Sequence, residues 1–389
     1  MHWPLTSKTE PGMRPPRQSV SPSTKLAFKL FRQLASEQQT RNLFFSPASV
    51  MLCLWMLHDG ATGETRESMA KVLEVADLDP EAMQLAFVAI KSALQVYGPL
   101  QLEAVYSVWC NQELAPRSEY VAKIREDYDA DVVALDFRDA ATAARINSWV
   151  SAKTRGKIGS ILCTIDPLTA LLAINAIYFK DLWSEPFERE LTREELFYMS
   201  EGGSLRVPLM RQNGSYLYYE ESKFQAISLH YKATRLAMYV FLPAKTSNLR
   251  EFQQNLTSTA WDAWIGRFEM IEGHIRLPRF KLIHSANLNN ALEKLGMGIA
   301  FDPRRARFDT INLPPPEIWI SQIVHRALVE VNEEGTEAAA ETEGTVYFSS
   351  EKPSARTFEM IVDRPFFFAI CDNYTNTILF MGSVEEPGS

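Results

Sequence analysis

Catalytic and metal-binding chemistry would show first in the histidines and in short motifs, and neither is arranged for it. The six histidines never stand at the spacing of metal ligands: His2, His58, His230, His274, His284 and His325. The sequence also lacks the GxSxG, HExxH, GxxxxGK[ST] and GxGxxG patterns of hydrolases, zinc peptidases and nucleotide-binding proteins. We therefore predict that the protein is not an enzyme and that it uses no metal and no cofactor.

The cysteines are the second place where chemistry could lie. Each of the four sits in a separate apolar run: Cys53, Cys110, Cys163 and Cys371. Scattered cysteines in apolar runs are typical of buried free thiols, and a disulfide framework or a metal site would need them closer together. We predict that all four are buried and unpaired.

An acidic stretch rich in small residues, residues 331–358, lies between two apolar segments. It reads VNEEGTEAAAETEGTVYFSSEKPSARTF. Unstructured segments longer than roughly 12–15 residues are uncommon in compact domains and are usually functional or disordered. This stretch is therefore the first candidate for function.

From residue 336 onwards the stretch alternates between two kinds of side chain. One parity is small and uncharged: Thr336, Ala338, Ala340, Thr342, Gly344 and Val346. The other parity holds three acids: Glu337, Glu341 and Glu343. A β-strand turns alternate side chains to opposite faces, so the segment could enter a sheet with its uncharged face toward a core. A short acidic helix and a disordered tether remain alternatives.

In the rest of the chain, the sequence predicts mainly helices in the N-terminal third and mainly strands after about residue 168. Ser46 is predicted to cap a helix that begins at Pro47 and ends at Gly60. From about residue 168, ALLAINAIYFK and RLAMYVFLPAK read as strands buried on both faces, and residues 274–296 as a strand followed by a helix capped at Ser285. We predict one α+β domain, residues 23–389, after a flexible extension of residues 1–22.

Composition limits the partners. The chain is 46% apolar, enough for a sizeable core, and its net charge of −8 comes without a dense basic stripe. The densest basic cluster, residues 304–307, reads as a solvated turn, so neither nucleic acid nor membrane is an expected partner. Because the N-terminus lacks the apolar core of a signal peptide, we expect a cytoplasmic protein, with secretion as the alternative.

Several segments resemble the serpin family of protease inhibitors. EEGTEAAAE resembles the hinge of the serpin reactive-centre loop, and MIVDRPFFFAI matches the family's C-terminal signature at every position. NLFFSPASV, NAIYFKDLWSEPF, VPLMRQ and VHRALVEVNEEGTEA stand in the family's order. The resemblance covers about residues 24–384 and is closest to an inhibitory member of prokaryotic or intracellular type.

The resemblance implies a fold of three β-sheets and about nine helices with an exposed reactive-centre loop, here about residues 333–358. It also implies a suicide mechanism in which a serine or cysteine protease cleaves the loop. The N-terminal half of the loop then inserts into the large sheet and drags the acylated protease with it, before deacylation. The implied hinge has eight residues: Glu333, Glu334, Gly335, Thr336, Glu337, Ala338, Ala339 and Ala340.

The hinge can be checked against the physical needs of insertion. The first side chain to be buried must be small and uncharged, since burying an unpaired charge costs several kcal/mol, and Thr336 meets this need. The three alanines that follow lose little side-chain entropy. Glu341 and Glu343 depart from the commonest pattern of the family but lie on the outward parity, so we expect them to be tolerated.

The resemblance also assigns residues beneath the strands that must separate. A buried polar cluster called the shutter would comprise Ser46, Ser49, Asn175 and His325, and Trp183 would lie near the point of loop insertion. Without the resemblance these residues read as a helix cap, a strand-edge residue, a core histidine and a core tryptophan. With it, we expect a hydrogen-bonded network that rearranges when a strand enters.

The cleaved bond follows from a count along the loop. In the family it falls roughly fourteen residues after the hinge glycine, which here gives Ser349–Ser350. Serine fits an elastase- or subtilisin-like pocket, whereas a slip of one residue would present Phe348 to a chymotrypsin-like protease. Lys352 and Arg356 are expected to attract trypsin-like enzymes, with the protein then behaving as a substrate.

We therefore predict a monomeric inhibitor of a serine protease with elastase-, subtilisin- or chymotrypsin-like specificity. The alternative is a non-inhibitory serpin that acts in binding, storage or chaperoning. Such members often carry a charged or bulky residue at the position of Thr336 or lack the alanine run, and this chain does neither. We expect no heparin-type site, because PEAMQLAFVAIKSALQVYG carries no basic cluster.

Overall fold

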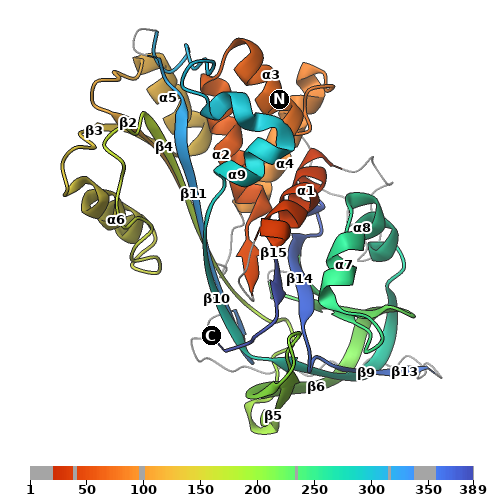
Figure 1. The fold of residues 1–389 in the computed structure, drawn as a ribbon. Helices are drawn as coiled ribbons and strands as arrows, with labels where there is room; N and C mark the ends of the chain where they lie inside the picture. Colours follow the sequence, from red (N-terminus) through yellow and green to blue (C-terminus); the bar gives the residue numbers. More distant parts are fainter. Residues whose placement is uncertain are drawn as a thin grey trace, which may run out of the picture.

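A computed structural model describes residues 21–37, 42–95, 101–232, 235–313, 317–336 and 356–388. These ranges contain nine α-helices and two hydrogen-bonded sheets (Figure 1). The helices are α1 (Pro22–Glu37), α2 (Pro47–Gly60), α3 (Gly63–Val72), α4 (Pro80–Leu94), α5 (Ser118–Tyr128), α6 (Thr142–Lys153), α7 (Leu249–Asn255), α8 (Ser258–Ile265) and α9 (Asn289–Leu292). Within the described ranges, no helix combines the length and the apolar character that crossing a bilayer requires.

The six-stranded sheet has the order β10-β11-β12-β4-β2-β3. Its strands are β10 (Phe280–Asn287), β11 (Ile320–Val331), β12 (Gly335–Thr336), β4 (Leu171–Leu182), β2 (Gln101–Asn111) and β3 (Asp131–Leu135). At its centre β4 and β11 run parallel and pair directly with each other. Both strands are rich in β-branched and aromatic residues and are buried almost throughout, as predicted for β4.

The nine-stranded sheet has the order β1-β15-β14-β8-β7-β6-β9-β13, with β5 paired to β6. Its strands are β1 (Leu43–Phe45), β15 (Thr377–Val384), β14 (Phe366–Asp372), β8 (Leu236–Pro243), β7 (Phe224–His230), β6 (Ser204–Glu221), β9 (Glu269–Pro278), β13 (Thr357–Ile361) and β5 (Arg193–Tyr198). The 18-residue β6 pairs with β5 near its start and with β7 near its end. It thereby joins two of the three expected sheets into one hydrogen-bonded path within the predicted α+β fold.

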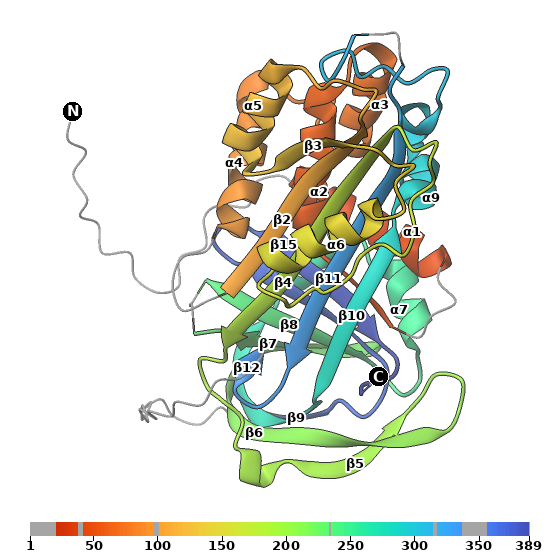
Figure 2. The ribbon, with the colours of Figure 1, turned by 90° about the vertical axis from the view of Figure 1, so that its left-hand side faces the viewer.

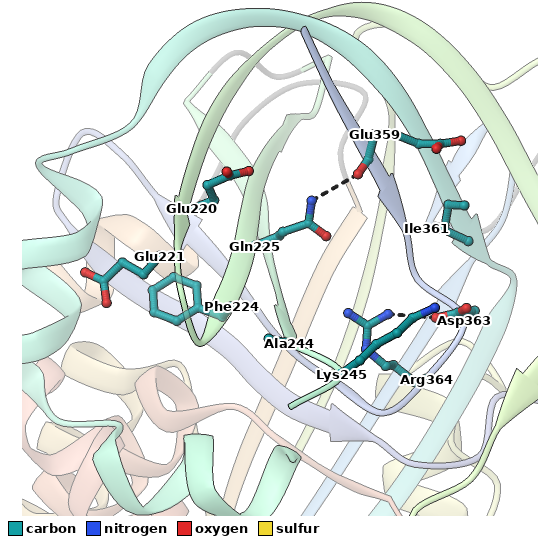
Figure 3. A pocket seen from close by; sticks show the side chains of 10 residues that line it. All are labelled: Glu220, Glu221, Phe224, Gln225, Ala244, Lys245, Glu359, Ile361, Asp363 and Arg364. Carbon is teal, nitrogen blue, oxygen red and sulfur yellow. Dashed lines mark hydrogen bonds and ion pairs between the residues drawn. The ribbon is translucent and has the colours of Figure 1, made fainter. Parts of the chain in front are cut away.

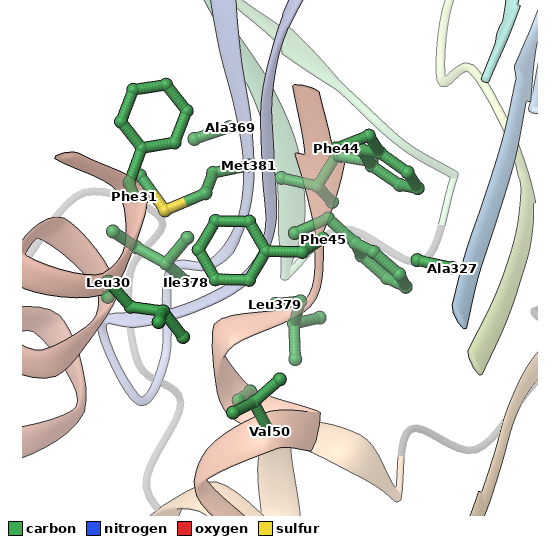
Figure 4. Close-up of a cluster of buried hydrophobic side chains, with 14 of the residues drawn as sticks. Leu30, Phe31, Phe44, Phe45, Val50, Ala327, Ala369, Ile378, Leu379 and Met381 are labelled. Atoms are coloured by element: carbon green, nitrogen blue, oxygen red, sulfur yellow. The ribbon is translucent and has the colours of Figure 1, made fainter. Parts of the chain in front are cut away.

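Helix α2 forms the centre of the core. Ser46 caps it as predicted, since its hydroxyl oxygen accepts a hydrogen bond from the Ser49 amide at 3.2 Å. Every residue of α2 except Asp59 is buried, because the helix has α1 and β15 on one side and β4 on the other. Figure 4 shows apolar side chains from α1, β1, α2 and β15 meeting there, among them Phe31 and Leu379.

Helix α6 covers the opposite face of the six-stranded sheet (Figure 2). Its Ile146 and Val150 pack in a second apolar cluster with Ile174 of β4 and Val324 of β11. The line along which β4 and β11 meet is therefore covered on one face by α2 and on the other by α6.

The prediction of a helix capped at Ser285 was wrong. Ser285 lies inside β10 and pairs with Arg326 of β11, so its backbone is committed to the sheet. The helix begins only at Asn289, whose amide donates to the Asn287 side-chain oxygen at 3.0 Å. Pairing with a distant strand has overridden the local capping signal.

The prediction that all four cysteines are buried was wrong for one of them. Cys53, Cys110 and Cys371 are buried and free, whereas Cys163 is free and exposed. Cys163 follows Leu162 in the connection between α6 and β4, and Leu162 takes the buried position. The basic turn was predicted correctly, since Arg304 and Arg305 are exposed in a turn.

Candidate functional site

The described start of the acidic stretch lies between the two central strands. β4 and β11 pair in parallel as far as Leu328 and Tyr178. Beyond this point they separate, and β12 pairs with both, so that Thr336 stands opposite Val331 and Asp181. We call residues 332–336 with their contacts the insertion point, and the paired length of β4 and β11 the seam.

Gly335 is the residue at which the backbone turns into the sheet. Its φ of +149° is one that side chains rarely adopt. A Cβ at this position would overlap the Asp181 carbonyl oxygen and lie 2.5 Å from the Leu182 Cα. Both the backbone angle and the close approach of β4 therefore require glycine.

Thr336 and Trp183 belong to one buried cluster at the insertion point. The Thr336 side chain is 0% exposed, and its hydroxyl shares a hydrogen bond of 3.1 Å with the hydroxyl of Tyr231. The Tyr231 ring stacks on Trp183 with centroids 4.5 Å apart. The Trp183 indole N–H donates to the Asn332 carbonyl oxygen at 2.9 Å, which fixes the turn before the hinge.

The two glutamates before the hinge glycine bind arginines of different exposure. The Glu333 side chain is 3% exposed and accepts hydrogen bonds from the Arg279 guanidinium at 2.5–2.8 Å and from the Thr192 hydroxyl at 2.5 Å. Burial raises the pKa of Glu333, but these hydrogen bonds outweigh it and leave the pKa below its ordinary value. Glu334 pairs with Arg189 nearer the surface.

Seven of the predicted site residues lie outside the described residues. They are the rest of the hinge, Glu337, Ala338, Ala339 and Ala340, and the residues around the predicted cleaved bond, Phe348, Ser349 and Ser350. Their roles stay predictions.

The four predicted shutter residues lie together beneath the seam. The Asn175 amide donates to the Ser49 hydroxyl at 2.5 Å, and its oxygen accepts from His325 Nδ1. The Ser46 amide donates to His325 Nε2 at 3.1 Å, and the Ser46 hydroxyl donates to the Leu379 carbonyl at 2.6 Å. Asn175 and His325 are direct partners across the parallel pair, so a strand inserted here must separate them.

These contacts settle the charge and tautomer of His325. Because Nε2 accepts from a backbone N–H, the proton must be on Nδ1, from which it points to the Asn175 oxygen. His325 is fully buried, and burial, with a smaller effect of His284, lowers its pKa to about 3. The imidazole is therefore neutral at physiological pH.

Sequence reasoning missed several members of this site. Tyr106 of β2 shares a 3.1 Å hydrogen bond with Ser49 and stands opposite Asn175, which extends the shutter to a third strand. Tyr231 and Arg279 hold Thr336 and Glu333 from 105 and 54 residues away. The two tyrosines read as ordinary core residues in their apolar runs, and no local signal indicated that Glu333 would bind Arg279.

The insertion point is arranged for β-strand pairing. Across the described ranges, no three His, Cys, Asp or Glu side chains are grouped closely enough to hold a metal ion. A two-residue strand already lies between β4 and β11, and the backbone that follows it can extend the same antiparallel ladder with both neighbours if they part.

Comparison with known proteins agrees with this geometry. The family model described as serpin (serine protease inhibitor) matches residues 21–387. Leukocyte elastase inhibitor A of Mus musculus is 34% identical over 393 residues, covering 95% of this chain and 100% of that protein. The native crystal structure of the thermophilic serpin tengpin is similar at a TM-score of 0.85 and 28% identity, covering 98% of this chain and 97% of that one.

A further likeness supports the fold alone. The structure of human thyroxine-binding globulin complexed with its hormone superposes at a TM-score of 0.86 with 24% identity, over 95% of this chain and 98% of that one. The family model and the elastase-inhibitor relative each span nearly the whole chain. On these grounds, the chain belongs to the serpin family.

Proposed function

We propose that this serpin inhibits a serine protease as a suicide substrate and is not itself a catalyst. The protease cleaves the reactive-centre loop, about residues 333–358, and the N-terminal arm of the loop then inserts between β4 and β11. The observation that carries this proposal is β12, in which the first two residues of the arm are already paired with both strands. Insertion is then the lengthening of an existing strand, which needs no new nucleus.

The antiparallel pairing gained when the seam opens supplies the driving force. In the described state β4 and β11 pair in parallel from Ile320 to Leu328. An antiparallel strand inserted between them would give each strand a new ladder and would bury the small, uncharged parity of the arm. Antiparallel pairing is slightly more stable per residue than parallel pairing, so the exchange favours the inserted state.

The proposed partner is a protease with a small or an aromatic primary pocket. The bond given by position, Ser349–Ser350, suits elastase- and subtilisin-like enzymes, and a cut after Phe348 would suit chymotrypsin-like ones. The name of the murine relative, leukocyte elastase inhibitor A, supports the first class. We propose that the protein acts as a monomer in the cytoplasm, with secretion as the alternative.

The second candidate is a non-inhibitory serpin that acts in binding, storage or chaperoning. Human thyroxine-binding globulin, which has the same fold and whose structure was solved in complex with thyroxine, supports keeping this candidate. Against this reading, Thr336 is small, uncharged and fully buried, so nothing in the first residue of the arm opposes insertion.

Incubation with elastase, subtilisin and chymotrypsin, followed by denaturing gel electrophoresis, separates the two candidates. An inhibitor gives a covalent complex that survives denaturation, and a carrier gives only a clipped chain. Mass spectrometry of the released C-terminal fragment then locates the cut. A fragment that begins at Ser350 supports the proposed register, one that begins at Ser349 shifts it by one residue, and one that begins at Thr357 contradicts it.

A further inference from the structure

The exit strand, β13, is where the chain leaves the reactive-centre loop and returns to the body of the protein. β13 pairs in parallel with β9, from Thr357 opposite Glu272 to Ile361 opposite Arg276. The peptide bond after Arg356 is therefore the last one before the sheet. A protease that cuts there must bind, on the C-terminal side of the bond, residues whose backbone is already paired with β9.

Phe358 fixes this strand by aromatic packing. Its side chain is 6% exposed, and its ring stacks on Tyr218 with centroids 3.9 Å apart and 9° between the planes. A second ring, Tyr216, contacts it edge-on. Gly273 of β9 lies directly against Phe358, and a Cβ there would overlap the ring and lie 2.6 Å from the Phe358 carbonyl oxygen.

Polar contacts add to the packing on the outer side. The Gln225 amide donates to the backbone carbonyl of Glu359 at 3.0 Å, as Figure 3 shows. The Glu359 carboxylate pairs with Arg276 at 3.3 Å, and Arg356 pairs with Glu220 at 3.4 Å. The wall of the shallow cavity beside β13, about 410 Å³ in volume, includes Glu220, Gln225 and Glu359. The chain is thus held on both sides of the bond that follows Arg356.

The other basic residue of the loop, Lys352, is also in a position that is unfavourable for cleavage by trypsin-like proteases. Between Thr336 and Thr357 the basic residues are Lys352 and Arg356. Lys352 is followed by Pro353, which has no backbone N–H and whose ring restricts the residue before it. Lys352 and Pro353 lie outside the described ranges, and the restriction follows from their covalent structure.

A protease can cut only a backbone that it can bind in extended form on both sides of the bond. Where that backbone is paired in a sheet, cleavage proceeds through local opening and its rate follows the population of the open form. At Arg356, opening would require Phe358 to leave its place between Tyr218 and Gly273. At Lys352, the leaving nitrogen belongs to a ring.

Contrary to the expectation that Lys352 and Arg356 attract trypsin-like enzymes, we propose that these two features exclude such proteases from the loop. Phe358 and Gly273 are the residues of the described structure that determine this specificity. Productive cleavage is then restricted to bonds before Lys352. A cut there leaves an inserting arm of the proposed length. The biological meaning of this exclusion rests on the proposed inhibitory function. The exclusion itself is a property of the native chain and can be measured without any inhibition assay.

The test is digestion of the native full-length protein with trypsin, with the C-terminal fragments identified by mass spectrometry. In the wild type we expect fragments that begin at Pro353 or Thr357 to be negligible. Phe358→Ala and Gly273→Ala, which empty or overfill the same contact, should each speed the cut after Arg356 by about tenfold or more. Pro353→Ala should open the bond after Lys352 and leave the one after Arg356 unchanged.

Glu220→Gln is the matched control, because it removes the exposed ion pair to Arg356 and keeps a side-chain oxygen that can accept the hydrogen bond from the Tyr218 hydroxyl. It should change the rate less than about twofold. Rapid cutting of the folded wild type after Arg356 or Lys352 would overturn the proposal, whatever the stability of the variants. So would a Glu220→Gln effect as large as that of Phe358→Ala. If no covalent complex forms with elastase, subtilisin or chymotrypsin, the proposed inhibitory function is rejected. The result of the trypsin digestion does not depend on that assay, so failure of the proposed function and failure of this inference can be told apart.

Discussion

The two ends of the reactive-centre loop are attached to the protein in different ways. At the insertion point the attachment is polar, through backbone pairing, the Thr336 hydroxyl and the ion pair of Glu333 with Arg279. At the exit strand it is mainly apolar, through Phe358 in its aromatic site and through the fully buried Met360. Both ends are paired with neighbouring strands, but the Thr336 and Glu333 side chains are held by hydrogen bonds, whereas Phe358 and Met360 are held by apolar packing.

This difference indicates which end can move. A hydrogen bond that is exchanged for an equivalent one changes the free energy little, because each bond contributes only about 0.5–1.5 kcal/mol net. Withdrawing a buried phenylalanine forfeits its whole contact surface in one step, about 3–5 kcal/mol when the ring is removed by mutation. In the proposed mechanism, the loop therefore lengthens β12 at one end while the other end stays docked on β9.

The largest expected effect is at the first residue of the arm. Thr336→Arg should abolish the covalent complex and turn the protein into a substrate, because an arginine is far larger than the fully buried threonine beside Tyr231 and its charge would have to be desolvated there. Thr336→Ser, which keeps a small side chain and a hydroxyl, is the control and should retain the complex. Gel assays of complex against clipped chain measure both. An undiminished complex with the arginine variant would contradict movement at the insertion point.

The next effect is on stability after cleavage. A cut at Ser349–Ser350 should raise the Tm by about 10 °C or more, since a strand's pairing and burial are gained while the exit strand stays in place. For a chain of this length the unfolding entropy is about 0.8 kcal/mol/K, so such a rise corresponds to about 8 kcal/mol. Calorimetry of intact and cleaved protein measures it. Cleaved Thr336→Arg is the control and should show little gain, whereas an equal gain would separate stabilisation from insertion.

Acid should loosen the seam before it loosens the exit strand. Burial lowers the pKa of His325 to about 3, so the unfolded chain takes up a proton near pH 6.5 that the folded chain refuses. The unfolding free energy contributed by this group is complete above pH 6.5 and falls as the pH drops toward 3, by about 1.4 kcal/mol between pH 7.5 and 5.5. Burial raises the pKa of Tyr218, the contact of Phe358, so acid leaves that site uncharged.

Hydrogen exchange at pH 7.5 and 5.5, corrected for intrinsic rates, measures this contrast directly. Protection should decrease along β11 and persist along β13. Urea unfolding of His325→Gln should show a smaller pH dependence than the wild type, although the variant is less stable overall. Equal loss of protection in both strands would mean that the two ends do not differ in their response to acid.

The smallest effects distinguish two neighbouring glutamates at the insertion point. Glu333→Gln should lower the unfolding free energy by about 1–3 kcal/mol, because it breaks hydrogen bonds between a buried carboxylate and Arg279. Glu334→Gln, whose partner Arg189 is more exposed, should cost less than about 1 kcal/mol. Chemical denaturation of the pair measures the difference. Similar losses would mean that burial does not set the strength of the polar end.

The sequence was informative where the signal is local. The cap at Ser46 and the apolar run of β4 each depend on neighbouring residues, and both are found where they were predicted. The alternation that begins at Thr336 is also a local signal, but beyond Thr336 it lies outside the described residues and stays a prediction. The resemblance to serpins brought together Ser49, Asn175 and His325, which no local pattern connects.

The remaining contacts could not be predicted because their partners lie far apart in the chain. Nothing near Arg279 indicates that it will bind Glu333, and nothing near Phe358 indicates that Gly273 will lie against its ring. The same limit explains the wrong cap at Ser285, where a strand 41 positions further along, at Arg326, decided the conformation. Such pairings become visible only once the register of the strands is known.

The register of β12 also determines which residues of β4 and β11 each residue of the inserted arm would face in the proposed mechanism. Because that strand is antiparallel to both neighbours, each residue after Thr336 lies one position further back on β11 and β4. Six residues on is Thr342, and six back from Val331 and Asp181 are His325 and Asn175. A threonine hydroxyl would thus arrive between the two side chains whose hydrogen bond has just been broken. The strand register thus places the shutter residues Asn175 and His325 opposite the middle of the inserting arm.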